Sequence, residues 1–72
     1  MDTISLTERE KTVLLYLGKG LKNSEISEKL NISVHTTKAH LEAMYEKLSV
    51  NNRLQAVIKA VTLGLMTLED LV

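Results

Sequence analysis

The 72-residue chain contains no cysteine, proline, phenylalanine or tryptophan. The missing cysteines exclude disulfide bonds and thiolate-bound metals. Without Phe or Trp, a core must be built from Leu, Ile, Val, Ala and Met, and the missing prolines leave helices uninterrupted. The longest apolar run is too short to cross a bilayer, and no signal-peptide pattern opens the sequence. We therefore expect a soluble, cytoplasmic, all-α protein that does not enter a membrane.

Length and charge narrow the possibilities further. The chain is long enough for one small core, so we assign residues 1–72 to a single domain. Its net charge is zero, but residues 11–59 carry eight basic and four acidic side chains and are +4, whereas residues 1–10 and 60–72 are each −2. A basic centre between acidic ends permits binding to nucleic acid without indicating it.

Capping residues and apolar spacing predict four helices, at about residues 8–19, 24–30, 34–48 and 53–63. Thr7 and Glu10 match a capping box, which places the first helix start at Glu8. Asn23 or Ser24 is the expected cap of the second helix. We therefore predict a compact four-helix fold.

The second and third helices are separated by only about three residues, a length typical of a helix-turn-helix. Ser33 is the expected cap of the third helix. Helical spacing predicts that one face of this helix is buried and that the opposite face is exposed. The buried face comprises Thr37, Leu41, Met44 and Leu48, and the exposed one His35, Ala39, Glu42 and Glu46.

The fourth helix, between Asn52 and Gly64, is apolar on two sides. We predict that its core face comprises Leu54, Val57, Ile58, Val61 and Leu65. The other side, with Ala56, Ala60 and Leu63, would then be exposed. Such a side either needs a partner or consists simply of good helix formers on a surface, and the residues alone leave both interpretations open.

No catalytic, cofactor or metal site is predicted. The serines lack a histidine and a carboxylate at a suitable spacing. His35 and His40 lie about 140° apart around a helix, so they do not converge on one metal. His40 is interpreted as partly buried or phosphate-facing. Arg53 either meets a phosphate or pairs with a carboxylate within the fold, and the structural role is slightly favoured. We expect neither an enzyme nor a small-molecule ligand in this segment.

A series of short motifs runs through the chain in a fixed order. They are Leu6-Thr7-Glu8-Arg9-Glu10, Gly20-Leu21-Lys22-Asn23-Ser24-Glu25-Ile26, Ile32-Ser33 to Thr36, Lys38, His40, Lys47-Leu48-Ser49-Val50, Arg53, Ala56 and Gly64-Leu65. Over about Leu6 to Met66, the chain resembles the LuxR-type (FixJ/NarL or GerE) helix-turn-helix DNA-binding domain. The promoter-reading domain of bacterial sigma factors is a close alternative, but His40 and Val50-x-x-Arg53 favour the LuxR type.

The resemblance implies a transcription-factor output domain that binds double-stranded DNA as a homodimer and positions or blocks RNA polymerase. It implies that the third helix enters the major groove and that the fourth makes the dimer contact. The positions of Lys38, Ala39 and Glu42 would approach base edges, where Lys38 would meet guanine or a phosphate and Ala39 a thymine methyl. The Glu42 carboxylate, which departs from the family pattern, needs a hydrogen-bond donor there, such as a cytosine N4. Further DNA contacts are expected from His35, Thr36, Ser33, Lys22, Asn23, His40 and Lys47, and dimer contacts from Ala56, Lys59, Ala60 and Leu63.

Several residues depart from the family pattern. Lys22 replaces a Ser or Thr cap but adds a phosphate ligand, and Thr37 replaces Val but can bond back to its own helix. Glu42 and Glu46 would repel DNA wherever they meet a phosphate. They leave a second interpretation open: an interaction module that does not bind DNA and titrates another regulator through its fourth helix. The sequence also leaves open whether an upstream signalling domain accompanies this segment.

Overall fold

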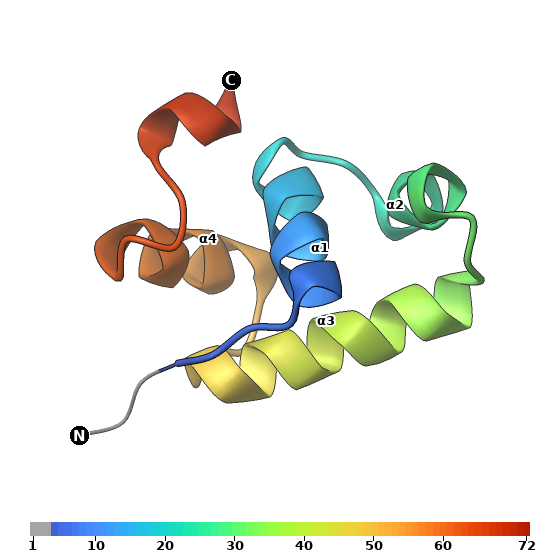
Figure 1. Ribbon diagram of the computed structural model, residues 1–72, viewed down its shortest axis with the longest axis horizontal. Coiled ribbons are helices and arrows are strands. Elements are labelled where there is room, and N and C mark those ends of the chain that lie inside the picture. Colours follow the sequence, from blue (N-terminus) through green and yellow to red (C-terminus); the bar gives the residue numbers. More distant parts are fainter. Residues whose placement is uncertain (1–3) are drawn as a thin grey trace.

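The computed structural model describes residues 4–72, which form four α-helices and one short 3₁₀ helix (Figure 1). These are α1 (Glu8–Gly18), α2 (Asn23–Leu30), α3 (Val34–Leu48), α4 (Arg53–Thr62) and η1 (Leu68–Leu71). The prediction of an all-α, four-helix fold is confirmed, and each helix end lies within one residue of its predicted position. Residues 1–3, including the acidic Asp2, lie outside the described residues.

Side-chain caps start three of the helices, and the caps at Thr7 and Ser33 are as predicted. The Thr7 hydroxyl accepts from the Glu10 amide at 3.1 Å and the Glu10 carboxylate accepts from the Thr7 amide at 2.9 Å, completing a capping box. Ser33 and Asn52 accept from backbone amides three residues later. The expected cap of α2 was wrong, because Lys22 occupies the N-cap and only the Glu25 carboxylate closes that turn, accepting from the Lys22 amide at 2.7 Å.

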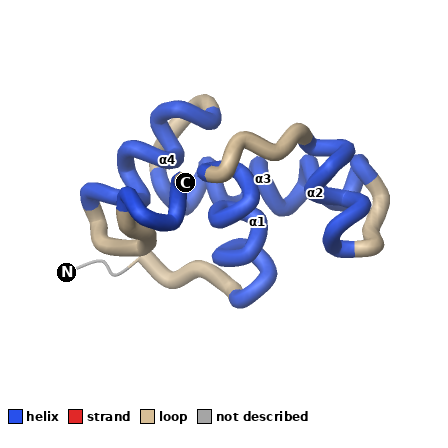
Figure 2. The backbone as a smooth tube through the Cα atoms, turned by 90° about the horizontal axis from the view of Figure 1, so that it is seen from above, coloured by secondary structure: helices blue, strands red, loops and turns tan. Residues whose placement is uncertain are grey.

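The two central helices, α1 and α3, pack across one another, and α2 and α4 lie at opposite ends of this pair (Figure 2). The core takes at least one buried side chain from each of α1, α2, α3 and α4. It comprises Leu6, Val13, Leu14, Leu17, Ile26, Leu41, Met44, Leu48, Ala56, Ala60 and Met66. All four residues predicted for the buried face of α3 are buried.

The predicted orientation of α4 was wrong. Its core residues are Ala56 and Ala60, both with no exposed surface, whereas Leu54 is 68% and Ile58 56% exposed. Small side chains let a helix backbone come close to its neighbours, and α4 uses them against α1 and α3. Both faces have helical periodicity, so spacing alone did not distinguish them.

The segment after α4 folds back onto α1 rather than over the end of α4. Gly64, with φ of +76°, ends the helix, and Met66 enters the core. Leu71 packs beside Gly18, where an added Cβ would lie 2.7 Å from the Leu71 side chain. Leu68 and Val72 are exposed.

A part-buried ion pair joins the two central helices. The Lys47 Nζ lies 2.7 Å from Glu10 Oε1, and only 6% of the Glu10 side chain is exposed. Burial alone raises the pKa of Glu10, but the hydrogen bonds from Lys47 and Thr7 and the charge of Lys47 outweigh it and lower the pKa. Glu10 therefore both caps α1 and fastens it to α3.

Candidate nucleic-acid interface

A tight joint fixes α3 against α2. Asn31 adopts the left-handed conformation, with φ of 55°, that asparagine tolerates better than most residues. The Ile32 amide donates to the Ser27 carbonyl at 3.0 Å, and the Ser27 hydroxyl bonds back to the Asn23 carbonyl at 2.7 Å. The short joint and the buried Ile26 together give the helix-turn-helix geometry.

Burial of one side of α3 determines which side faces outwards. Thr37 lies in the core, and its hydroxyl donates to the Ser33 carbonyl at 3.2 Å, as expected for a threonine inside a helix. Lys38, Ala39 and Glu42 are all exposed on the outer side. The structure thus brings together the three residues predicted to approach bases.

Lys38 and Glu42 border a shallow depression that α2 and the start of α4 complete. Asn23, Leu41, Tyr45 and Arg53 are its other lining residues, and its volume is about 340 Å³. Arg53 Nη1 donates to the Leu21 carbonyl at 2.7 Å and so ties the start of α4 to the segment before α2. This bond supports the structural role expected of Arg53.

Burial raises the pKa of Tyr45 in the same depression, and the positive charge of Arg53 only partly opposes the shift. The phenol therefore stays protonated at neutral pH. Tyr45 was not predicted as a site residue, because a tyrosine at helical spacing reads as ordinary packing.

The remaining predicted contacts surround this face. Ser33 and Thr36 share a hydroxyl–hydroxyl bond of 2.9 Å at the start of α3, and Ser33 also caps the helix. Lys22 and His35 are exposed, whereas His40 is half-buried. These positions form a rim around the exposed side chains of Lys38 and Glu42, and their contacts with phosphate stay a prediction.

Lys47 does not belong to this rim. Its ammonium is held by the buried carboxylate of Glu10, on the side of α3 that packs against α1. Helix geometry places Lys47 about 180° around α3 from Lys38. The charge of Lys47 therefore serves the fold, and a contact between Lys47 and DNA stays a prediction.

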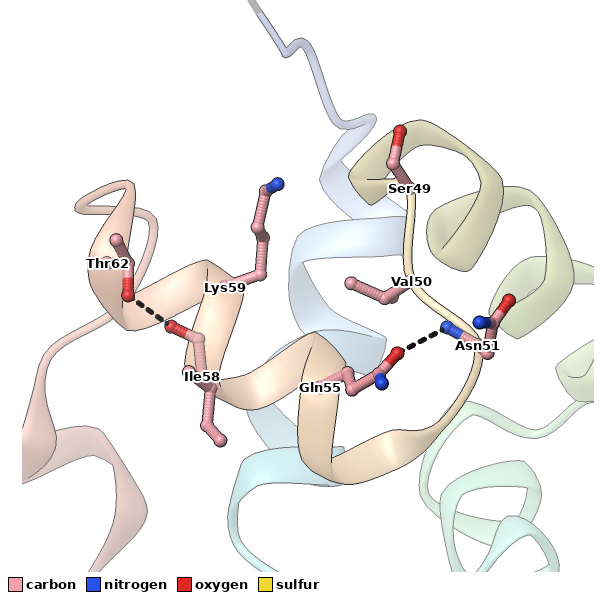
Figure 3. Close-up of a pocket in the computed structure, with 7 residues that line it drawn as sticks. All are labelled: Ser49, Val50, Asn51, Gln55, Ile58, Lys59 and Thr62. Atoms are coloured by element: carbon pink, nitrogen blue, oxygen red, sulfur yellow. Dashed lines mark hydrogen bonds between the residues drawn. The ribbon is translucent and has the colours of Figure 1, made fainter.

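The predicted dimer face also needs correction. Ala56 and Ala60 have no exposed surface and cannot touch a second molecule. Leu63 is 46% exposed, and Lys59 is half-buried beside a depression that runs from the α3–α4 joint along α4 (Figure 3). The exposed apolar surface of α4 is instead that of Leu54 and Ile58, which we had placed in the core. The only feature of the sequence that indicated their exposure was the pair of small residues, Ala56 and Ala60, on the opposite side of the helix.

Residues 4–72 form neither a membrane-spanning helix nor a cluster of metal ligands. None of the helices formed by residues 4–72 has the length and apolarity needed to cross a membrane. Within the same residues, no three His, Asp or Glu side chains come together in a way that would hold a metal ion.

The sequence of the chain is similar to those of bacterial regulatory proteins. Residues 4–60 match the model of bacterial regulatory proteins of the luxR family. The transcriptional regulatory protein LnrK of Bacillus subtilis is 48% identical over 63 residues, which are 88% of this chain and 29% of LnrK. The response regulator protein VraR of Staphylococcus aureus is 46% identical over 55 residues, 76% of this chain and 26% of VraR. The chain thus spans less than a third of the length of these relatives.

Two solved structures share the fold. The response regulator ChrA of a heme-sensing two-component system superposes with a TM-score of 0.85 at 38% identity, over 92% of this chain and 33% of ChrA. The Vibrio cholerae VqmA dimer, described as a LuxR-type receptor, gives the same TM-score of 0.85 at 27% identity, over 97% of this chain and 33% of VqmA.

Proposed function

Because the chain belongs to the luxR family of bacterial regulatory proteins, we propose that it binds double-stranded DNA sequence-specifically, as a homodimer, with α3 in the major groove. The relatives are transcriptional and response regulators, a class without enzymatic activity. Bacterial DNA lies in the cytoplasm, and we place the protein there. Bound to an operator, it would position RNA polymerase or block it.

The exposed face of α3 is the observation that carries this proposal. In a helix-turn-helix, residues from the N-terminal part of the second helix contact base edges. Lys38 and Ala39 lie in the first half of α3 and Glu42 lies near its middle, and all three are exposed. The buried residues on the other side hold the helix in one rotational position, so this face is already formed before DNA binds.

Phosphate contacts would come from the rim. Lys22 and Ser33 start α2 and α3, where backbone amides of the first turn also point outwards and favour anions. Asn23, Thr36, His35 and His40 complete the set. Such contacts fix the position of a protein on DNA without reading its sequence.

Dimerisation would use the apolar face of α4. Leu54 and Ile58 lie one helical turn apart and are mostly exposed. An isologous contact between two such faces would bury all four of these side chains. It would place two α3 helices on half-sites about one helical turn, roughly 10 bp, apart.

Titration of mixed-sequence duplex DNA at two salt concentrations tests DNA binding. Binding should weaken steeply with salt, because phosphate contacts release counterions. Lys38→Ala should weaken binding further, by about 1–3 kcal/mol if Lys38 reads guanine. Lys11→Ala is the matched control, since Lys11 is an exposed lysine on α1 paired with Glu8. An equal loss in both variants would contradict a specific role for Lys38.

A second candidate function is supported by the charge of α3. Glu42 and Glu46 are exposed on the face proposed to meet DNA, and the whole chain has no net charge. The protein would then titrate another regulator through Leu54 and Ile58 without binding DNA. Absence of binding even at about 50 mM salt, where phosphate contacts are strong, would favour this function.

A further inference from the structure

We propose that Glu42 selects cytosine, and that this carboxylate, together with Lys38, sets the sequence preference of the protein. The inference rests on the proposed DNA-binding function and names the base that one side chain recognises. Glu42 is the least expected residue on this face, since a carboxylate is repelled by the phosphate backbone.

The fold does not allow Glu42 to turn away. Its neighbour Leu41 is in the core at 5% exposure, and Met44, two residues later, has no exposed surface. These two anchors fix the rotation of α3 at Glu42. The carboxylate therefore projects on the same side as Lys38, one helical turn earlier.

Within residues 4–72 the Glu42 carboxylate has no hydrogen-bond or ion-pair partner, in contrast to the glutamates that serve the fold. Glu8 pairs with Lys11, Glu10 with Lys47, and Glu25 accepts from the Lys22 amide. Arg53, which lines the same depression, donates instead to the Leu21 carbonyl. The acceptor atoms of Glu42 thus remain available to a ligand.

Major-groove chemistry then selects the base. The cytosine N4 amino group donates a hydrogen bond, whereas guanine N7 and O6 and thymine O4 are acceptors that repel a carboxylate. Adenine offers the N6 donor, but its N7 acceptor lies beside it. Only cytosine presents a donor without a competing acceptor on the same base.

The spacing between the two side chains adds a geometric expectation. Residues four apart on a helix are separated by about 6 Å along its axis, which is about two steps of 3.4 Å along DNA. If Lys38 meets guanine, the half-site should contain that guanine and a cytosine about two base pairs apart. On unrelated DNA the unsatisfied carboxylate weakens binding, which raises the ratio of specific to non-specific affinity.

Selection from randomised duplexes by the purified chain tests the proposal, with Glu42→Gln and Glu46→Gln compared in parallel. Glutamine has nearly the same shape but pairs with adenine N6 and N7. Glu42→Gln should therefore change the preferred base at one position of the half-site from cytosine to adenine, by about 5- to 100-fold in relative affinity. Both substitutions are at exposed positions, so the fold should persist.

Glu46→Gln is the matched control, because it removes the same charge one turn further along the helix. It should strengthen binding to all sequences alike and leave the preferred bases unchanged. The proposal is overturned if Glu42→Gln also leaves them unchanged, since Glu42 would then act only as a general repulsive charge. If the wild-type chain binds no duplex at low salt, the proposed function itself fails, and with it this inference.

Discussion

The observed orientation of α4 predicts opposite effects on stability for substitutions at Ala60 and at Ile58. Ala60→Leu adds three carbons at a position with no exposed surface, packed between α4 and the central helices. Overpacking of this kind costs about 1–3 kcal/mol. Ile58→Ala removes a side chain that is 56% exposed, so stability should change by no more than about 0.5 kcal/mol. Alanine also favours the helix slightly more than isoleucine.

Thermal unfolding followed by helical circular dichroism measures both effects. For a domain of this size, each kcal/mol shifts the midpoint by about 4–8 °C. Ala60→Leu should therefore lower Tm by roughly 5–20 °C, and Ile58→Ala by no more than about 4 °C. The measurements should be made at low protein concentration. At higher concentration, self-association through α4 would stabilise the wild-type protein, and Ile58→Ala would remove that stabilisation.

If the α4 face predicted from periodicity were the core face, the two substitutions would have the opposite effects on stability. With Ile58 in the core, Ile58→Ala would cost about 2–5 kcal/mol, and Ala60→Leu would lie on the surface with little effect. Observation of that pattern would refute the packing of α4 described above. It would also remove the proposed dimer face, because Leu54 lies on the same side of the helix as Ile58.

Three further predictions concern pH, backbone strain and the cap of α2. The pKa of Glu10 in the folded protein is below its ordinary value of 4.5, so the ion pair with Lys47 stabilises the fold above pH 4.5. This stabilisation is lost as the pH falls through the folded pKa. Glu10→Gln removes the titrating group and should therefore reduce the fall of the urea unfolding midpoint between about pH 6 and 3. Ser49 has a left-handed backbone with φ of 57°, so Ser49→Gly should raise the free energy of unfolding by about 0.5–1 kcal/mol, whereas Ser49→Ala should not. Lys22→Ser should supply the missing cap and add about 0.5–2 kcal/mol of stability, yet lower the salt dependence of DNA binding by about one phosphate contact; unchanged salt dependence would exclude Lys22 from the interface.

The candidate site could be predicted in part because α3 has only one apolar face. Thr37, Leu41, Met44 and Leu48 leave a single choice of core face, and the exposed positions of Lys38 and Glu42 follow from it. The ion pair of Lys47 could not be predicted in this way, because the spacing of a lysine near the end of a helix does not show whether it contacts DNA or a residue of another helix. Its role depends on Glu10, 37 residues earlier in the chain.

By itself, the sequence determined the class of fold, the four helices and the joint between α2 and α3. Each of these depends on interactions between residues a few positions apart, such as the Thr7–Glu10 capping box and the left-handed Asn31. Only the tertiary structure decided which side of α4 enters the core and which charges pair across the molecule. The four-helix core has room beside α1 and α3 for a helix backbone at close approach, and Ala56 and Ala60 allow that approach where Leu54 and Ile58 would not.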